Sequence, residues 1–299
     1  MKSLNVLEHI TIHKDEKTYD GFPNIIITNN NKIIVAFRLA KDRQKETGKV
    51  FHNDITGKGV YVSSEDNGVT WLEEPKVIYD HPLGGMNDTN ITLLSDGTIL
   101  AVFYRWRGFM IEDVKDLKPW DTVIDNKYVW RLDGTYTLRS VDEGLSWDEP
   151  VKVDFKGNDM ELHSRGKAVE LSDKLMLLPL NGSGPSYRAN PIESILAVSK
   201  DKGLNWEFYS TIAKSDTVDF YETTVYRTPK GKLVAFIRGI CREYKSDCGL
   251  YYCESYDNGL TWNEVKRASF EVSSTVFDVI TLNDGNALLT YGYRKEPYG

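Results

Sequence analysis

The chain has 299 residues, of which 40% are hydrophobic, so it is long enough for one large hydrophobic core or for two ordinary domains. Its 37 basic and 44 acidic side chains give a formal net charge of −7 and are scattered along the chain, which argues against a nucleic-acid partner. The sequence contains no run approaching the ~20 apolar residues of a membrane span and no signal peptide, so a cytoplasmic location is the default expectation.

Pairs of short apolar strands are predicted along the whole chain. After a first strand at residues 4–13, the run PNIIITNNNKIIVAFR (23–38) places an Asn-rich turn between two apolar segments. The same arrangement returns in TNITLLSDGTILAVFYR, GKAVELSDKLMLLPL, TTVYRTPKGKLVAFIR and VFDVITLNDGNALLTYGYR. No stretch shows sustained helical periodicity, so the pattern predicts an all-β protein built from repeated units.

A turn motif, S-x-D-x-G-x-(T/S/N)-W, joins two further strands in each of the first four units. It reads SEDNGVTW from Ser64, SVDEGLSW from Ser140, SKDKGLNW from Ser199 and SYDNGLTW from Ser255. Gly supplies a backbone conformation with positive φ, while Asp and Ser or Thr can hydrogen-bond the amides of the turn. The indole is expected to pack between adjacent sheets, which predicts a structural role for Trp71, Trp147, Trp206 and Trp262.

One unit therefore holds four antiparallel strands, and such units arranged radially form a β-propeller. We expect a single domain over residues 1–299. In this topology the motif turns lie on one face, while the innermost strands begin, and the second strands end, on the opposite face near the central axis. The motif aspartates Asp66, Asp142, Asp201 and Asp257 are therefore expected to lie far from any axial binding site.

Charged residues recur at the strand ends on that opposite face. The starts of the innermost strands carry Asp20, Asp88, His163, Arg165, Glu222 and Asp278, and the ends of the second strands carry Arg38, Arg105, Arg238 and Arg294. Equivalent positions in different units converge on one axis, so these side chains are expected to surround a concave site. A solvated rim explains any single charge, but it explains their recurrence less well.

Two further segments have open interpretations. The insertion WRGFMIEDVKDLKPWDTVIDNKYVW (106–130) carries Trp106, Trp120 and Trp130, which could stack on sugar rings or pack against their own blade. The three cysteines Cys241, Cys248 and Cys253 fit no zinc or redox spacing and are expected as buried or half-buried thiols. A bridge from Cys241 to Cys248 is the alternative in an oxidising compartment. No metal cluster is evident, and no cofactor is expected.

The four motif turns resemble the Asp-box repeats of sialidases and their relatives, which are six-bladed propellers, and the resemblance covers nearly the whole chain. Four complete units and a partial fifth do not fill six blades. Either the N-terminal strand completes a fifth blade and closes the ring, or the chain is a shortened version of a six-bladed parent. We favour closure by the N-terminal strand.

The resemblance also implies site residues. Asp54 in FHNDITGKG resembles the acid/base Asp of the first blade, Glu222 the Glu that assists a tyrosine nucleophile, and Tyr291 that tyrosine, with Tyr293 as its rival. Arg238 resembles one of three arginines that bind the carboxylate of sialic acid. Two departures are Gly21, where the Arg-Ile-Pro motif has its arginine, and Asp278, where a further arginine would be wanted.

The resemblance thus implies an exo-acting glycoside hydrolase that removes a terminal, acidic sugar from a glycan, so the expected partner is carbohydrate. The incomplete set of arginines leaves two alternatives. One is an exo-acting hydrolase or lyase for a different acidic or neutral sugar, and the other is a propeller that binds a glycan without cleaving it.

Overall fold

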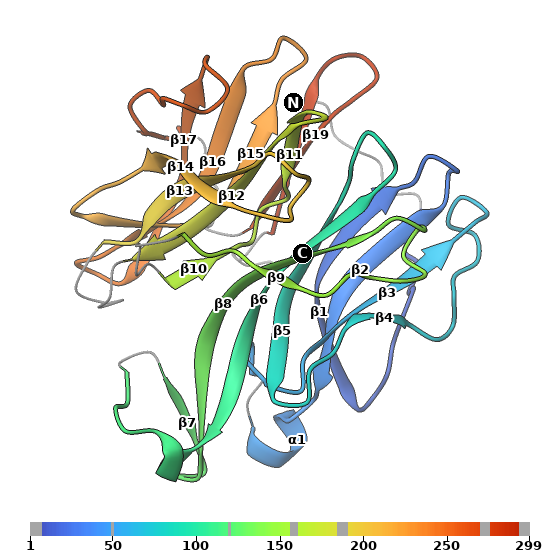
Figure 1. The fold of residues 1–299 in the computed structure, drawn as a ribbon, viewed down its shortest axis with the longest axis vertical. Coiled ribbons are helices and arrows are strands. Elements are labelled where there is room, and N and C mark those ends of the chain that lie inside the picture. Colours follow the sequence, from blue (N-terminus) through green and yellow to red (C-terminus); the bar gives the residue numbers. More distant parts are fainter. Residues whose placement is uncertain are drawn as a thin grey trace.

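The computed structural model describes residues 8–48, 51–118, 121–155, 161–183, 191–269 and 276–292. Antiparallel strands dominate these residues, and helix is confined to α1 (Gln44–Thr47) and the 3₁₀ turn η1 (Ile111–Asp113). The strands form five sheets arranged as a β-propeller, which confirms the all-β prediction (Figure 1). No helix in the described part of the chain is long and apolar enough to cross a membrane.

The first two blades each place their strands in the order expected for a propeller. The first contains β1 (Thr18–Ile27), β2 (Ile33–Lys41), β3 (Lys58–Ser64) and β4 (Lys76–Tyr79). The second contains β5 (Gly84–Leu93), β6 (Ile99–Met110), β8 (Tyr128–Ser140) and β7 (Thr122–Ile124), and β9 (Val151–Lys152) also pairs with β8. β6 and β8 extend as a long hairpin with β7 near its end and α1 beside it (Figure 1).

Three further sheets follow in the described part of the chain. The third contains β10 (Glu161–His163), β12 (Leu175–Ser183), β13 (Glu193–Ser199) and β14 (Glu207–Ala213), with β11 (Val169–Ser172) also paired to β12. The fourth contains β15 (Val218–Arg227), β16 (Leu233–Cys241), β17 (Ser246–Ser255) and β18 (Lys266–Arg267). The fifth has two strands, β19 (Phe277–Thr281) and β20 (Ala287–Tyr291).

The N-terminal segment differs from the expected strand. Its described residues, from Glu8 onward, form no strand before Thr18. Instead His13 Nδ1 lies 2.8 Å from a carboxylate oxygen of Asp20, and its ring packs against Phe37. Ile12 packs on the same face of the first blade, beside Val35 and Trp71. Ile12 and His13 thus pack on the first blade, whereas Ile10 is exposed.

Each Asp box is a closed hydrogen-bonded turn. In the first, Asp66 Oδ1 accepts from Ser64 Oγ and from the backbone N–H of Thr70, both at 2.8 Å, and Asp66 Oδ2 accepts from Thr70 Oγ1 at 2.6 Å. The other three boxes repeat this set of bonds. The hydrogen bond from Thr70 is the main cause that lowers the pKa of Asp66 to about 2.

Three of the boxes also join neighbouring blades. The carbonyl of the box glycine accepts a hydrogen bond from the preceding blade: Gly144 from Tyr61 (2.9 Å), Gly203 from Thr137 (3.0 Å) and Gly259 from Ser210 (2.6 Å). The indoles of these three boxes pack into interblade cores, where Trp206 is only 6% exposed and Trp147 and Trp262 are half-buried. Trp71 of the first box is half-buried against its own blade and Ile12. The boxes therefore hold blades together.

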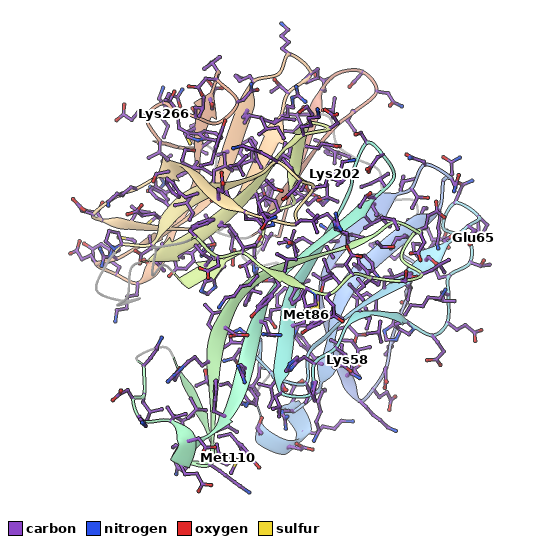
Figure 2. All side chains as sticks on the ribbon, in the orientation of Figure 1. Lys58, Glu65, Met86, Met110, Lys202 and Lys266 are labelled. Atoms are coloured by element: carbon purple, nitrogen blue, oxygen red, sulfur yellow. The ribbon has the colours of Figure 1, made fainter. Side chains whose placement is uncertain are left out.

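The boxes and the axial site lie at opposite ends of the second strands. The box serines Ser64, Ser140, Ser199 and Ser255 pair with Ile33, Ile99, Met176 and Leu233 near the starts of those strands. Residues five positions further on lie about 17 Å away along an extended strand. Glu65 and Lys202, from two box turns, lie away from Met110 at the end of the extended hairpin (Figure 2).

Candidate functional site

β-bulges near the starts of the innermost strands redirect one residue in each of the first, second and fourth blades toward the axial cluster. The ladder register shifts between Gly21 and Asn24, between Asn87 and Asn90, and between Tyr221 and Thr224. Inside these bulges the non-glycine residues Phe22, Asp88 and Glu222 have φ values of 58°, 51° and 49°. Positive φ is costly for such residues, and it is found where a bulge redirects a side chain at a functional site.

In the third blade Arg165 lies in the corresponding interruption, between β10 and β11. Its Nε donates to Asp88 Oδ2 at 2.5 Å, and its Nη1 lies 3.1 Å from Glu222 Oε1. The guanidinium also lies 4.8 Å from the ring centroid of Phe22. Bulge residues from four consecutive blades therefore form one contiguous cluster, in which Arg165 contacts the other three.

Glu222 receives a second guanidinium. Arg238 Nη1 donates to both of its carboxylate oxygens, at 2.9 and 3.0 Å. The backbone N–H of Glu222 donates to Asn181 Oδ1 at 3.3 Å. Two arginines and a side-chain amide thus fix both the carboxylate and the backbone of Glu222, which pre-organises this group toward the pocket described next.

A pocket of about 280 Å³ opens beside this cluster, between the second, third and fourth blades. It is lined by Tyr104, His163, Arg165, Asn181, Tyr221, Glu222, Arg238 and Ile240. Of these eight side chains, Glu222 alone carries a carboxylate. The pocket is small by the standard of drug-sized ligand sites, so it suits one compact polar group such as a single sugar ring.

The pairing of the strands corrects the expected position of Arg105. It also shows two site residues, Tyr104 and Asn181, that the sequence analysis did not name. Arg38, Tyr104, Asn181 and Arg238 pair with Gly21, Asn87, His163 and Tyr221 and so occupy equivalent positions. Arg105, expected in this ring, is one residue further along β6. Since successive side chains of a strand point to opposite faces, Tyr104 lines the pocket. Ile33, Ile99 and Leu233 each pair with a motif serine and begin the segments IIVAFR, ILAVFY and LVAFIR. An alignment of these three segments places Tyr104 at the position of Arg38 and Arg238 and would have identified it.

Arg105 instead forms a cluster away from the pocket-lining residues. Its Nε donates to Asp133 Oδ2 at 2.8 Å, and its guanidinium also hydrogen-bonds the hydroxyls of Tyr79 (2.9 Å) and Tyr136 (2.7 Å). Arg38 is completely buried. Its Nη2 donates to the carbonyls of Phe51 (3.2 Å) and Asp54 (3.5 Å), so Arg38 supports the loop that follows α1.

Asp54, Glu222 and Tyr291 lie in different surroundings. Asp54 is 1% exposed, forms an ion pair with Arg43, and accepts from Thr56 through the backbone N–H (2.9 Å) and the hydroxyl (2.8 Å). Tyr291 pairs with Phe277 at the end of β20 and is 43% exposed. Neither Asp54 nor Tyr291 lines the pocket that contains Glu222.

The remaining acidic candidates are engaged elsewhere. Asp20 binds His13 and accepts from Thr18 Oγ1 at 3.0 Å, on the side of the first blade covered by the N-terminal segment. Asp278 forms an ion pair with Lys167 at 2.7 Å, which connects the fifth sheet to the third blade. Tyr293 and Arg294 lie outside the described residues.

Burial shifts the pKa values of three groups in and beside the cluster. Burial raises the pKa of Asp88, and the nearby Arg165 only partly offsets this effect. Burial, with a smaller contribution from Arg165, lowers the pKa of His163 to about 4, so its imidazole is neutral at neutral pH. Burial also raises the pKa of Tyr104, and the carboxylate of Asp88 raises it further. The neutral side chains of His163 and Tyr104 therefore line the pocket beside Arg165, Arg238 and Glu222.

The insertion packs against its neighbours. Trp130 is 3% exposed, its ring lies 5.8 Å from that of Phe51, and the guanidinium of Arg43 lies 5.8 Å from its centroid. Trp106 is half-buried, and Trp120 lies outside the described residues. Trp130 is therefore buried in packing, and these contacts are with the loop around α1 of the first blade rather than with its own blade. The three cysteines are free thiols, buried at Cys253 and half-buried at Cys241 and Cys248. The described residues contain no group of acidic, His or Cys side chains that could hold a metal ion.

The fold and the axial pocket define an Asp-box β-propeller with a polar site at the ends of its innermost strands. A family model for the BNR repeat-like domain matches residues 115–297, more than half of the chain. The chain belongs to this BNR repeat-like family. No curated protein matches it.

Solved structures with the same fold include both uncharacterised proteins and glycosidases. A Dyadobacter fermentans protein of unknown function is 32% identical, with a TM-score of 0.84 over 97% of this chain and 79% of that one. The NanB sialidase of Streptococcus pneumoniae (14% identity, TM-score 0.67) matches 98% of this chain, which spans 59% of the sialidase. An α-L-arabinanase of Penicillium chrysogenum (14% identity, TM-score 0.62) matches 94% of this chain and 77% of its own. The chain thus has the propeller fold of these glycoside hydrolases.

Proposed function

We propose that this protein is an exo-acting glycoside hydrolase that binds the terminal sugar of a glycan in the axial pocket. The observation that carries the proposal is the convergence of bulge residues from four blades beside a pocket with a single carboxylate. A pocket of about 280 Å³ suits one terminal sugar better than the interior of a polysaccharide chain. The hydroxyl, amide and imidazole groups on its wall suit the hydroxyl groups of a sugar ring.

Glu222 is the group that we assign to the chemistry. Glycosidic cleavage develops positive charge at the anomeric carbon, and a carboxylate held close to that carbon stabilises it. Arg165 and Arg238 fix the Glu222 carboxylate in place. They also neutralise part of its charge, so substrate binding has to loosen at least one of these contacts for Glu222 to act.

The charge balance bears on which sugar is preferred. Within the cluster Arg165 and Arg238 are matched by Asp88 and Glu222, and Arg38 and Arg105 are committed elsewhere. An acidic sugar would have to compete with these carboxylates for its guanidinium partners. This favours a neutral terminal sugar over the sialic acid expected from the resemblance.

A panel of glycosides tests the proposal. Terminal arabinose, rhamnose, uronic acid and sialic acid glycosides are incubated with the parent protein and with the variant Glu222→Gln, which keeps the shape of the side chain. We expect hydrolysis of at least one neutral substrate, and a fall of roughly 10²- to 10⁴-fold in turnover per folded molecule for the variant. The matched control is Glu193→Gln, because Glu193 also binds a cation, Lys214 at 2.7 Å, but lies outside the pocket lining.

A non-catalytic glycan-binding propeller is the second candidate. It is favoured by the positions of Asp54 and Tyr291, which do not line the pocket with Glu222. Binding of a glycan without turnover of any substrate in the panel would support this candidate and contradict the hydrolase. Normal turnover by Glu222→Gln would remove Glu222 from the mechanism. Folded fractions are compared by near-UV circular dichroism.

A further inference from the structure

Tyr104 occupies a position in the second blade that arginine occupies in two other blades. The strand pairing gives Tyr104 of β6 the same register position as Arg38 of β2 and Arg238 of β16. Arg38 is completely buried, whereas Tyr104 and Arg238 both line the axial pocket. We propose that Tyr104 makes this pocket selective for neutral sugars over acidic sugars, an inference that rests on the proposed binding of a terminal sugar there.

The fourth blade shows what an arginine does at this position. Arg238 lies opposite the residue that precedes Glu222, the bulge residue of its blade, and its Nη1 donates to both carboxylate oxygens of Glu222, at 2.9 and 3.0 Å. Tyr104 likewise lies opposite the residue that precedes Asp88, the bulge residue of the second blade. Because a neutral phenol cannot balance the charge of that carboxylate, Asp88 depends on a guanidinium of the third blade, Arg165, at 2.5 Å.

The tyrosine thus leaves the cluster without a surplus of positive charge. Among the described residues of the cluster, two guanidinium groups, Arg165 and Arg238, face two carboxylates, Asp88 and Glu222. An arginine in place of Tyr104 would give three cations against two anions. The additional guanidinium could then bind the carboxylate of an acidic sugar in a bidentate manner, which the present balance of charges does not favour.

The surroundings of Tyr104 keep its hydroxyl neutral and hold it in place. Burial raises the pKa of Tyr104, and the charge of Asp88 raises it further. Asn87 Nδ2 donates to the Tyr104 hydroxyl oxygen at 3.0 Å, and the Tyr104 ring lies 5.4 Å from that of His163. A hydroxyl that is fixed and uncharged can exchange hydrogen bonds with a sugar hydroxyl, which is both a donor and an acceptor.

Matched pairs of sugars test this role. The probes are the methyl glycosides of glucose and galactose and of their uronic acids, which differ only in the C6 hydroxymethyl or carboxylate group, together with methyl arabinoside and methyl rhamnoside. Affinities are measured by isothermal titration calorimetry at low ionic strength, where charge interactions are least screened. The parent should bind the neutral member of a pair more tightly. Tyr104→Arg should raise the affinity for the acid relative to the neutral sugar by roughly 10- to 100-fold, as expected for hydrogen bonds to a charged group.

Two further variants complete the test. Tyr104→Phe keeps the ring and removes only the hydroxyl, so it remains informative if Tyr104→Arg does not fold. It should weaken binding of the preferred neutral sugar by about 3- to 10-fold, the usual worth of one uncharged hydrogen bond. Tyr128→Arg is the matched control, because Tyr128 is 37% exposed at the start of β8 and lies outside the pocket lining, and it should keep the affinity ratios of the parent.

The outcomes separate this inference from the proposed function. If the parent binds and hydrolyses no sugar of either panel, the proposed function fails and the role of Tyr104 fails with it. If the parent binds sugars, the role of Tyr104 alone is overturned by any of three results. These are tighter binding of the acidic sugars by the parent, a folded Tyr104→Arg that keeps the parent's ratios or shares its change with Tyr128→Arg, and a Tyr104→Phe that binds the neutral sugar as tightly as the parent. Packing of Tyr104 alone would change stability and leave the ratios unaltered.

Discussion

The guanidinium of Arg165 binds two carboxylates at once, Asp88 at 2.5 Å and Glu222 at 3.1 Å, and its side chain is only 13% exposed. Burial lowers the pKa of this guanidinium, but Asp88 and Glu222 outweigh that effect and raise it overall, so Arg165 remains charged. Removing one member of such a group leaves the others with uncompensated charge in a buried site. At the residue scale, the pocket therefore depends on Arg165 as much as on Glu222.

Arg165→Met should destabilise the fold by about 3–5 kcal/mol, because it leaves Asp88 buried without its cation. Burial already raises the pKa of Asp88 and Arg165 opposes that shift, so the variant raises the pKa further. The folded variant then binds a proton that the unfolded chain releases, and its stability should fall as the pH rises from about 5 to about 8. Urea unfolding at both pH values measures this. A loss of stability that does not depend on pH would contradict this prediction. The same holds for a loss that persists in the double variant Arg165→Met/Asp88→Asn.

At the scale of elements, the second, third and fourth blades carry stabilising and functional residues at opposite ends. The box turn at one end binds the neighbouring blade through its glycine carbonyl and its indole. The bulge at the other end aims a charged or aromatic side chain at the axis. A change in a box is therefore expected to alter stability without altering the pocket.

The box tryptophans should differ in energetic weight. Trp206 is 6% exposed, and its Nε1 donates to Thr137 Oγ1 of the preceding blade at 3.1 Å, whereas Trp262 is only half-buried. Trp206→Ala should therefore cost about 3–5 kcal/mol, as for other large core aromatics, and Trp262→Ala distinctly less. Chemical unfolding of the two variants gives the comparison. An equal or larger loss of unfolding free energy in Trp262→Ala would show that the burial of the indole does not determine the energetic cost of its removal.

At the scale of the whole molecule, the five described sheets are unequal. The first four blades contain at least four strands each, and the fifth sheet contains two. Within the described residues, β20 pairs with β19 alone. The fifth sheet contacts the fourth blade through hydrogen bonds of Thr224 Oγ1 with the carbonyl of Phe277 (2.6 Å) and of Tyr226 with Thr281 (2.7 Å). The ion pair of Lys167 and Asp278 and a small apolar cluster around Leu250 add to these contacts.

Amide hydrogen exchange should reveal this inequality. We expect β19 and β20 to exchange faster than β12 and β13, because the described side chains of β19 and β20 include few buried apolar groups. β12 and β13 lie between two interblade cores. Peptide-level exchange measured by mass spectrometry at neutral pH tests the expectation. Equal protection in both pairs of strands would mean that the fifth sheet is held more strongly than its described contacts indicate.

The sequence alone determined the repeating unit, because alternating apolar residues and the local hydrogen-bonding needs of S-x-D-x-G-x-(T/S/N)-W are properties of short segments. It also predicted that Asp88, Arg165, Glu222 and Arg238 meet at the axis, since equivalent positions of a radial repeat converge. Only the tertiary structure decided which charges compensate one another. A bulge or a register shift of one residue turns a side chain to the opposite face of the sheet. For this reason Tyr104, and not the expected Arg105, lines the pocket. Asp54 is buried and His52 lies beside Phe22 because the loop after α1 folds back on the first blade and is tied through Asn53 to β7 of the second blade, which no local pattern records.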